Sequence, residues 1–194
     1  MITQVVYFSG VQCTTKTTTI RNVATELNKA GFSMYVFPEM GYIPNYERGS
    51  VHMQSWYKKE LFLREQLINY MIHHKIVDIV LADRSPMDVE VYNTYFGLKD
   101  GREISDYWEP DMINKHNVIM LRPVEEIVNS IVKRYADETH RENWNEHETE
   151  YVDTIQQIFH NIGAEREYGM FSVLYDETRM VDLILNFMIR KEII

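Results

Sequence analysis

VVYFSGVQCTTKT, the stretch from Val5 to Thr17, predicts more about this chain of 194 residues than any other part of its sequence. Residues 5–9 form a short run of mostly β-branched and aromatic side chains, which is typical of a strand buried on both faces. Residues 10–17 match the pattern G-x-x-x-x-G-K-[ST], except that Thr15 replaces the second glycine. A helical pattern over residues 16–30 follows. This order predicts a phosphate-binding loop, because inward-facing backbone N–H groups and a helix N-terminus together bind anions.

The predicted loop assigns chemistry to individual residues. We expect Lys16 to reach the β- and γ-phosphates of a nucleotide, and the Thr17 hydroxyl to bind Mg²⁺. The Cβ of Thr15 is expected to crowd the phosphates or to oppose a positive φ. The residues expected to bind the nucleotide are Gly10, Cys13, Thr14, Thr15, Lys16, Thr17 and Thr18. The alternative interpretation is a threonine-rich strand-to-helix turn that binds nothing.

The rest of the chain alternates short apolar runs with longer amphipathic ones, as parallel strands joined by crossover helices do. Further strands are predicted over residues 33–37, 78–82, 117–121 and 171–175, and further helices over residues 51–74, 88–96, 124–136, 148–162 and 179–191. No internal repeat and no proline- or serine-rich linker divides the sequence. We therefore predict a single α/β domain over residues 1–194.

A second signal is the sequence ADRS, from Ala82 to Ser85, at the end of one predicted strand. A strand that ends in aspartate brings a carboxylate to the carboxyl edge of the sheet, beside the phosphate-binding loop. We expect Asp83 to hold Mg²⁺ directly or through water, and Arg84 to clamp a phosphate or to neutralise charge in the transition state. The alternative interpretation is a strand end with a helix N-cap at Ser85 and an incidental ion pair.

Glu39 ends the sequence FPE after the second predicted strand and places another carboxylate across the same crevice. It is expected to accept a proton from an attacking hydroxyl, or to bind a sugar hydroxyl of the acceptor. Arg64 and Gln66, on the helix predicted over residues 51–74, are candidates to bind the acceptor's phosphate or base edge. A surface glutamate and a solvated helix face are the alternative interpretations.

The segment DETHRENWNEHETE, from Asp137 to Glu150, is highly polar. Phosphoryl transfer requires cations near the γ-phosphate, and a lid that excludes water prevents simple hydrolysis of ATP. We therefore interpret residues 134–150 as a candidate lid that carries Arg134 and Arg141 as catalytic cations. The alternative interpretation is a solvated loop whose neighbouring cations complement a helix dipole.

Composition and charge restrict the function further. Lys and Arg number 20 and Asp and Glu number 29, so the net charge is −9, which disfavours nucleic-acid binding through phosphate neutralisation. Cys13 is the only cysteine, cannot form an internal disulfide, and indicates a reducing compartment. No apolar run approaches the ~18 residues of a membrane span, and no signal-peptide pattern is present. We predict a cytoplasmic protein with no membrane partner.

Together these motifs resemble the P-loop nucleoside and nucleotide kinases of the thymidylate kinase and deoxynucleoside kinase type. The resemblance rests on GVQCTTKT from Gly10, FPE from Phe37, LFLR ending at Arg64, ADRS from Ala82, and the arginines of the candidate lid. It implies a five-stranded parallel sheet with helices on both faces and ATP as the phosphate donor with Mg²⁺. The implied reaction transfers the γ-phosphate to a nucleoside or nucleoside monophosphate, in deoxynucleotide metabolism. We also expect a homodimer.

Two positions leave the acceptor open between a nucleoside hydroxyl and a nucleotide phosphate. Met40 stands where eukaryotic-type thymidylate kinases carry an arginine, and Glu39 resembles equally well the catalytic base of deoxynucleoside kinases. Two further hypotheses remain. The first is a P-loop kinase that acts on a polynucleotide hydroxyl, such as a DNA or RNA end or a modified base. The second is a degenerate nucleotide-binding module without kinase activity.

Overall fold

The computed structural model describes residues 3–11, 14–39, 49–98, 117–122, 149–166, 168–173 and 176–194. Its elements are, in chain order, β1 (Gln4–Ser9), α1 (Lys16–Lys29), β2 (Met34–Phe37), α2 (Val51–His74), β3 (Ile79–Asp83), α3 (Pro86–Tyr95), β4 (Asn117–Arg122), α6 (Thr149–Glu165), β5 (Gly169–Ser172) and α7 (Glu177–Arg190). The helix predicted over residues 124–136 lies outside the described residues, and so does nearly all of the candidate lid.

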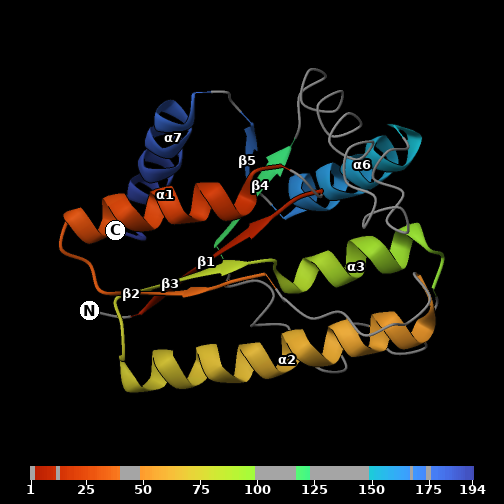
Figure 1. Cartoon of the computed structure of the whole chain (residues 1–194), viewed down its shortest axis with the longest axis horizontal. Helices are drawn as coiled ribbons and strands as arrows, with labels where there is room; N and C mark the ends of the chain where they lie inside the picture. Colours follow the sequence, from red (N-terminus) through yellow and green to blue (C-terminus); the bar gives the residue numbers. More distant parts are fainter. Residues whose placement is uncertain are drawn as a thin grey trace.

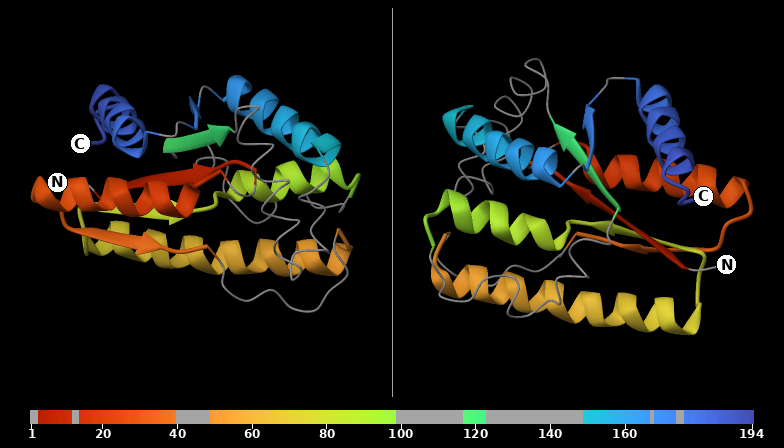
Figure 2. Two further views of the ribbon diagram at one scale, coloured as in Figure 1. Left: turned by 45° about the horizontal axis from the view of Figure 1, so that its top comes forward. Right: turned by 180° about the vertical axis from the view of Figure 1, so that it is seen from behind.

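The five strands form one sheet in the order β2-β3-β1-β4-β5, and every neighbouring pair is parallel. Helices α1 and α7 cover one face, whereas α2, α3 and α6 cover the other (Figure 1 and Figure 2). The predicted five-stranded parallel sheet with helices on both faces is therefore confirmed. Because β1 is central, the turn that follows it lies at the middle of the carboxyl edge.

The apolar runs of the sequence become strands that are buried on both faces. In β1, Val6 and Phe8 pack with α1 and α7, while Val5 and Tyr7 pack with the helices of the opposite face. Burial of each large apolar side chain contributes about 1.5–3 kcal/mol to stability. The central strands are thus held firmly, and the residues at their carboxyl ends have fixed positions.

Helix α3 and strand β5 each begin two residues before the predicted start, as does α7 at Glu177. Helix α3 begins at Pro86, two residues before the predicted start, because proline is well suited to the first helical turn and Asp88 accepts a hydrogen bond from the Ser85 N–H at 2.8 Å. Strand β5 begins at Gly169, which pairs with Ile119. A Cβ on Gly169 would stand 2.7 Å from the ring of Phe187, so this glycine permits close packing inside the strand.

Within the residues described, no helix combines the length and the apolar character that crossing a bilayer requires.

Candidate active site

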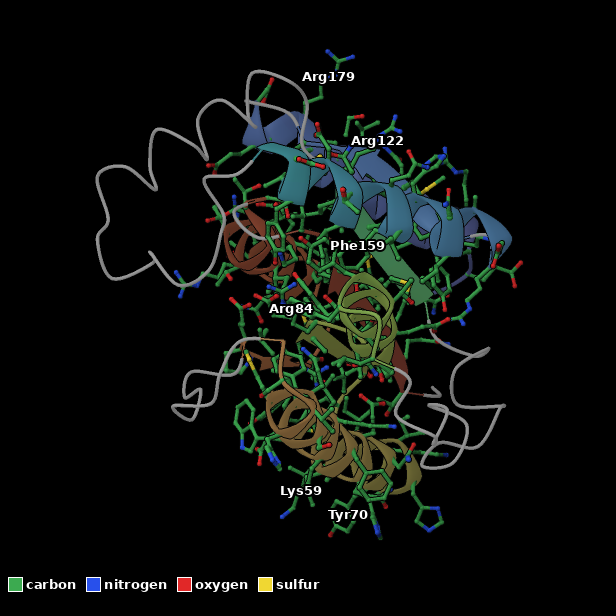
Figure 3. All side chains as sticks on the ribbon, turned by 90° about the vertical axis from the view of Figure 1, so that its right-hand side faces the viewer. Lys59, Tyr70, Arg84, Arg122, Phe159 and Arg179 are labelled. Carbon is green, nitrogen blue, oxygen red and sulfur yellow. The ribbon has the colours of Figure 1, made fainter. Side chains whose placement is uncertain are left out.

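The candidate site lies where the carboxyl ends of β1, β2 and β3 meet the N-terminus of α1. Figure 3 looks onto this edge, with Arg84 in the middle of the molecule. Gly10 starts the turn after β1 with a φ of 135°, and a Cβ there would stand 2.2 Å from the carbonyl oxygen of Leu121 in β4. Only glycine fits this position, because the backbone of β4 occupies the space of a side chain.

Thr15 adopts the left-handed conformation that the loop pattern assigns to a glycine, with a φ of 58° at the N-cap of α1. Its carbonyl accepts the first helical hydrogen bond, from the Thr19 N–H at 2.9 Å. A side chain was expected to oppose a positive φ at this position. The left-handed conformation costs about 1–2 kcal/mol here, but the loop still adopts it. The threonine does not prevent the backbone geometry of the loop.

Lys16 is buried beneath the loop. Its Nζ donates to the carbonyl oxygens of Gly10 at 3.1 Å and Val11 at 2.8 Å, and to Oγ1 of Thr14 at 3.4 Å. Burial and, to a smaller extent, the nearby Arg84 cation lower the pKa of Lys16 to about 8. No carboxylate within the described part of the chain forms a salt bridge with this ammonium. A buried cation held only by neutral oxygens favours the binding of an anion.

Thr17 and Asp83 are brought together as predicted, since the threonine Oγ1 donates to Oδ2 of Asp83 at 2.7 Å. Oδ1 of Asp83 is buried and accepts no hydrogen bond from any described residue. Burial raises the pKa of this carboxyl, whereas Lys16 and the Thr17 hydroxyl act in the opposite direction. A buried carboxylate oxygen without a donor, beside a hydroxyl, is a suitable pair of ligands for Mg²⁺. The described ranges contain no group of three or more His, Cys, Asp or Glu side chains that could hold a metal.

Arg84 makes four hydrogen bonds that join three parts of the site. Its Nε and Nη2 donate to Oε1 of Glu39 at 2.9 and 2.7 Å, and its Nη1 donates to the Gly10 carbonyl and to Oδ1 of Asp88, both at 3.0 Å. The arginine is buried, whereas the Glu39 side chain is 47% exposed. The sequence-predicted Glu39, Asp83 and Arg84 thus meet at one edge of the phosphate-binding loop.

Sequence reasoning missed Asp88, which is fully buried. Its Oδ2 accepts from the Ser9 hydroxyl at 2.6 Å and from the Ser85 N–H, while its other oxygen binds Arg84. Two local signals were available in the sequence. Ser85 and Asp88 have the spacing of a helix capping box, and Arg84 and Asp88 have the i,i+4 spacing of a helical ion pair.

Sequence reasoning also missed two tyrosines near Arg84. Burial raises the pKa of both Tyr57 and Tyr92, and the positive charge of Arg84 acts on both in the opposite direction. The hydroxyl of Tyr92 is buried and bonds to none of the described residues. These phenols come from α2 and α3, so both helices contribute polar groups to the region around Arg84.

The remaining predicted residues have different positions. Arg64 is buried on α2 and directs its guanidinium at the backbone carbonyls of Asp83 and Arg84, whereas Gln66 lies on the exposed side of the same helix. The structure therefore does not bring Arg64 and Gln66 together. Thr14 is buried and donates to the Val11 carbonyl at 2.9 Å, and Thr18 is exposed. Cys13, Arg134 and Arg141 lie outside the described residues.

A cavity of about 330 Å³ adjoins the phosphate-binding loop and continues between β4 and α6. Its lining includes Gly10, Val11, Arg122, Asp153, Phe159 and His160. Arg122 and Phe159 are labelled in Figure 3, on the α6 side of Arg84. The cavity lining does not include Arg84 or Glu39.

These features together define a P-loop nucleotide-binding protein. They are a strand, a turn with a left-handed residue before the lysine, a buried lysine, and a Thr–Asp pair at the strand ends. The comparison of sequences agrees with this class. A family described as an AAA domain (AAA_28) matches residues 5–166, and the chain belongs to this family. No curated protein matches the sequence.

Solved structures of two P-loop kinases have a similar fold. A deoxyadenosine kinase from M. mycoides, solved with the products dCMP and dCDP, has a TM-score of 0.57 at 14% identity, and the match covers 95% of this chain and 98% of that one. A thymidylate kinase from Ehrlichia chaffeensis has a TM-score of 0.56 at 14% identity, and the match covers 97% and 99% of the two chains. The resemblance to nucleoside and nucleotide kinases, and their fold, are thereby confirmed.

Proposed function

We propose that this protein is a kinase that transfers the γ-phosphate of ATP to a nucleoside or nucleoside monophosphate. One observation carries the proposal: the buried Lys16, the pair Thr17 and Asp83, and the pair Arg84 and Glu39 all surround the turn that starts at Gly10. Cations, a metal-binding pair and a carboxylate base at one helix N-terminus are the groups that phosphoryl transfer uses. The fold shared with two kinases supports the same assignment.

The residues that would bind ATP, the phosphate donor, have separate roles. The backbone of the loop and Lys16 bind the phosphates, and the ammonium compensates the charge that moves toward the leaving group. Thr17 and Asp83 would hold Mg²⁺, which neutralises charge on the phosphate oxygens when it is bound. The candidate cations Arg134 and Arg141 remain proposals for closing over the γ-phosphate.

The charges around Arg84 favour a hydroxyl as the preferred acceptor. This guanidinium is bonded to two carboxylates, those of Glu39 and Asp88, so its positive charge is already compensated. A phosphate acceptor would add negative charge beside these carboxylates, whereas a neutral nucleoside would not. In the proposed step the nucleoside oxygen attacks the γ-phosphorus, Glu39 accepts the hydroxyl proton, and ADP leaves.

The other hypotheses have less support. A polynucleotide substrate requires a basic surface, which disagrees with the net charge of −9. A degenerate module requires a damaged loop, yet Thr15 adopts the conformation of the glycine that it replaces. In addition, Asp83 has a buried oxygen that accepts no hydrogen bond from the described residues. Cytoplasmic location and homodimer formation stay predictions.

A panel of acceptors tests the proposal. The protein is incubated with Mg·ATP and nucleosides, nucleoside monophosphates, single-stranded DNA or no acceptor, and ADP and the phosphorylated product are measured. We expect product with at least one nucleoside, and none with Lys16→Met, which keeps the apolar stem without the charge. ADP formation that no acceptor stimulates would contradict the assignment, and a DNA product with a steep salt dependence would support the polynucleotide hypothesis.

A further inference from the structure

Arg84 is held in a strained backbone conformation. Its φ of 79° lies in the left-handed region, which is unfavourable for a residue with a side chain. Such a conformation costs about 1–3 kcal/mol and persists where the surroundings impose it. The Arg84 N–H donates to the Phe8 carbonyl at 2.9 Å, so β1 holds the amino side of this residue.

The carbonyl side is held from α2 by Arg64. Its Nη1 donates to the carbonyl oxygen of Asp83 at 2.7 Å, and its Nη2 donates to the carbonyl oxygen of Arg84. In an extended strand, successive carbonyls point toward opposite neighbours. One planar guanidinium reaches both oxygens because residue 84 has left the extended conformation. The two hydrogen bonds therefore favour the strained conformation over the relaxed one.

Arg64 is itself well fixed. The side chain is 8% exposed, and its Nε lies 3.9 Å from Oε1 of Glu65. The Tyr7 hydroxyl, from the central strand, donates to the other oxygen of Glu65. Both Tyr7 and Glu65 are buried. These contacts connect the guanidinium of Arg64 to β1 as well as to β3. They therefore restrict the orientations that the guanidinium can adopt.

We propose that Arg64 is a positioning residue whose guanidinium holds Arg84 in the left-handed conformation, and so directs the Asp83 carboxylate at Thr17 and the Arg84 guanidinium at Glu39. This role replaces the expectation that Arg64 binds the acceptor. Its kinetic consequences rest on the proposed kinase function, whereas its structural consequence does not.

The structural consequence is tested with a crystal structure of Arg64→Met, which keeps the apolar stem of the side chain and removes every donor. We expect residue 84 to leave the left-handed region, or its guanidinium to leave Glu39 and Asp88. An unchanged residue 84 with unchanged contacts would overturn the proposal, whatever the activity. If Arg64→Met does not fold, Arg64→Lys, which cannot bridge both carbonyls with a planar fork, provides the same measurement.

The kinetic consequence is tested by comparing transfer to a nucleoside with ATP hydrolysis in the absence of acceptor. Displacement of Asp83 and Arg84 should lower both rates, by about 10²-fold in Arg64→Met, with partial recovery in Arg64→Lys. Rates are expressed per nucleotide-binding site, measured by calorimetry, so that unfolded protein does not contribute. The acceptor KM and the preference among bases should stay unchanged.

A loss confined to the acceptor KM or to base preference would overturn the proposal and assign Arg64 to acceptor binding. Arg190→Met, which removes an exposed arginine from α7, is the matched control and should leave both rates unchanged. A wild-type protein that transfers phosphate to no acceptor would count against the proposed function alone, since the crystal structure still decides the role of Arg64.

Discussion

Lys16 and Arg84 donate hydrogen bonds to the same acceptor, the carbonyl oxygen of Gly10, at 3.1 and 3.0 Å. Two cations thus converge on one neutral oxygen at the start of the phosphate-binding loop, and the charge of Arg84 contributes to the low pKa of Lys16. A phosphate oxygen is a stronger partner for both groups than a carbonyl, because a hydrogen bond between two charged groups is about twice as strong. We therefore expect phosphate charge to be stabilised most strongly close to this shared acceptor.

The first prediction concerns the pH dependence of ATP binding. In the free protein, the pKa of Lys16 is about 8 because the side chain is buried beside Arg84. Bound phosphates favour the charged ammonium and raise this pKa. Below about pH 8, Lys16 is already charged and binding needs no proton; above it, binding takes up a proton and the affinity falls as the pH rises. Calorimetry at about pH 9, in buffers with different ionisation enthalpies, should detect this uptake, and Lys16→Met should abolish it. Absence of proton uptake in the wild type would contradict the prediction.

The second prediction separates a steric clash from backbone strain. Gly10 and Gly31 both have a positive φ, but a Cβ on Gly10 would stand 2.2 Å from the Leu121 carbonyl oxygen and a Cβ on Gly31 would meet no atom within 4 Å. We expect Gly10→Ala to lower the free energy of unfolding by at least about 2 kcal/mol more than Gly31→Ala. Urea denaturation of the two variants measures the difference. Equal losses would show that β4 can move away from the loop.

The third prediction concerns the threonine at the glycine position. Thr15→Gly removes a left-handed cost of about 1–2 kcal/mol and adds about 0.5–1 kcal/mol of unfolded-state entropy, so thermal unfolding should shift slightly upward. ATP should bind more tightly, since the Cβ no longer crowds the phosphates. Lys75→Gly is the matched control. Lys75 also has a left-handed φ, of 50°, but it is the C-cap of α2 and not part of the phosphate-binding loop. This substitution should raise stability without changing ATP affinity. Weaker ATP binding in Thr15→Gly would assign a binding role to the threonine side chain.

Most of the fold was predictable because its signals are local. Apolar runs bounded by turns identify strands that are buried on both faces, and β1 lies within one residue of the predicted range. The helix predicted over residues 51–74 coincides with α2. Three starts are predicted less well, since α3, α7 and β5 each begin two residues early, β5 at Gly169. A glycine normally indicates a strand boundary, and only the packing of Phe187 against that glycine explains its place inside the strand.

The site was predictable only where a residue's role follows from its position in a motif. Lys16, Thr17 and Asp83 occupy positions that the loop and the strand end define, and the structure places them together. Asp88 and Arg64 act through tertiary contacts instead. Asp88 binds Ser9 across 79 positions of sequence, and Arg64 binds carbonyls that become available only because Arg84 is left-handed. These two long-range contacts leave no periodic or compositional trace in the sequence, although the capping-box spacing of Ser85 and Asp88 does indicate a local role for Asp88.

The last prediction distinguishes a hydroxyl acceptor from a phosphate acceptor through Glu39. Glu39→Gln keeps an oxygen that accepts the hydrogen bonds from Arg84 and removes the basicity. A nucleoside hydroxyl is a poor nucleophile at neutral pH and depends on a positioned base, which contributes about 10²–10⁴-fold. A monophosphate oxygen is already ionised and needs only positioning and charge compensation. We therefore expect kcat to fall by about 10²-fold or more for the best nucleoside and only a few-fold for a monophosphate.

The pH profile provides a second measurement of the same role. With a hydroxyl acceptor, the wild-type rate should fall at acidic pH as Glu39 becomes protonated, and this acidic limb should be absent in Glu39→Gln. Glu26→Gln is the matched control, since Glu26 is an exposed glutamate of α1 that pairs only with Lys29 in the described structure. Full activity of Glu39→Gln toward the best nucleoside, with an unaltered profile, would remove Glu39 from the catalytic residues. Because Arg84 binds Glu39 through Nε and Nη2 and Asp88 through Nη1, such a result would reassign Glu39 to holding the arginine in place.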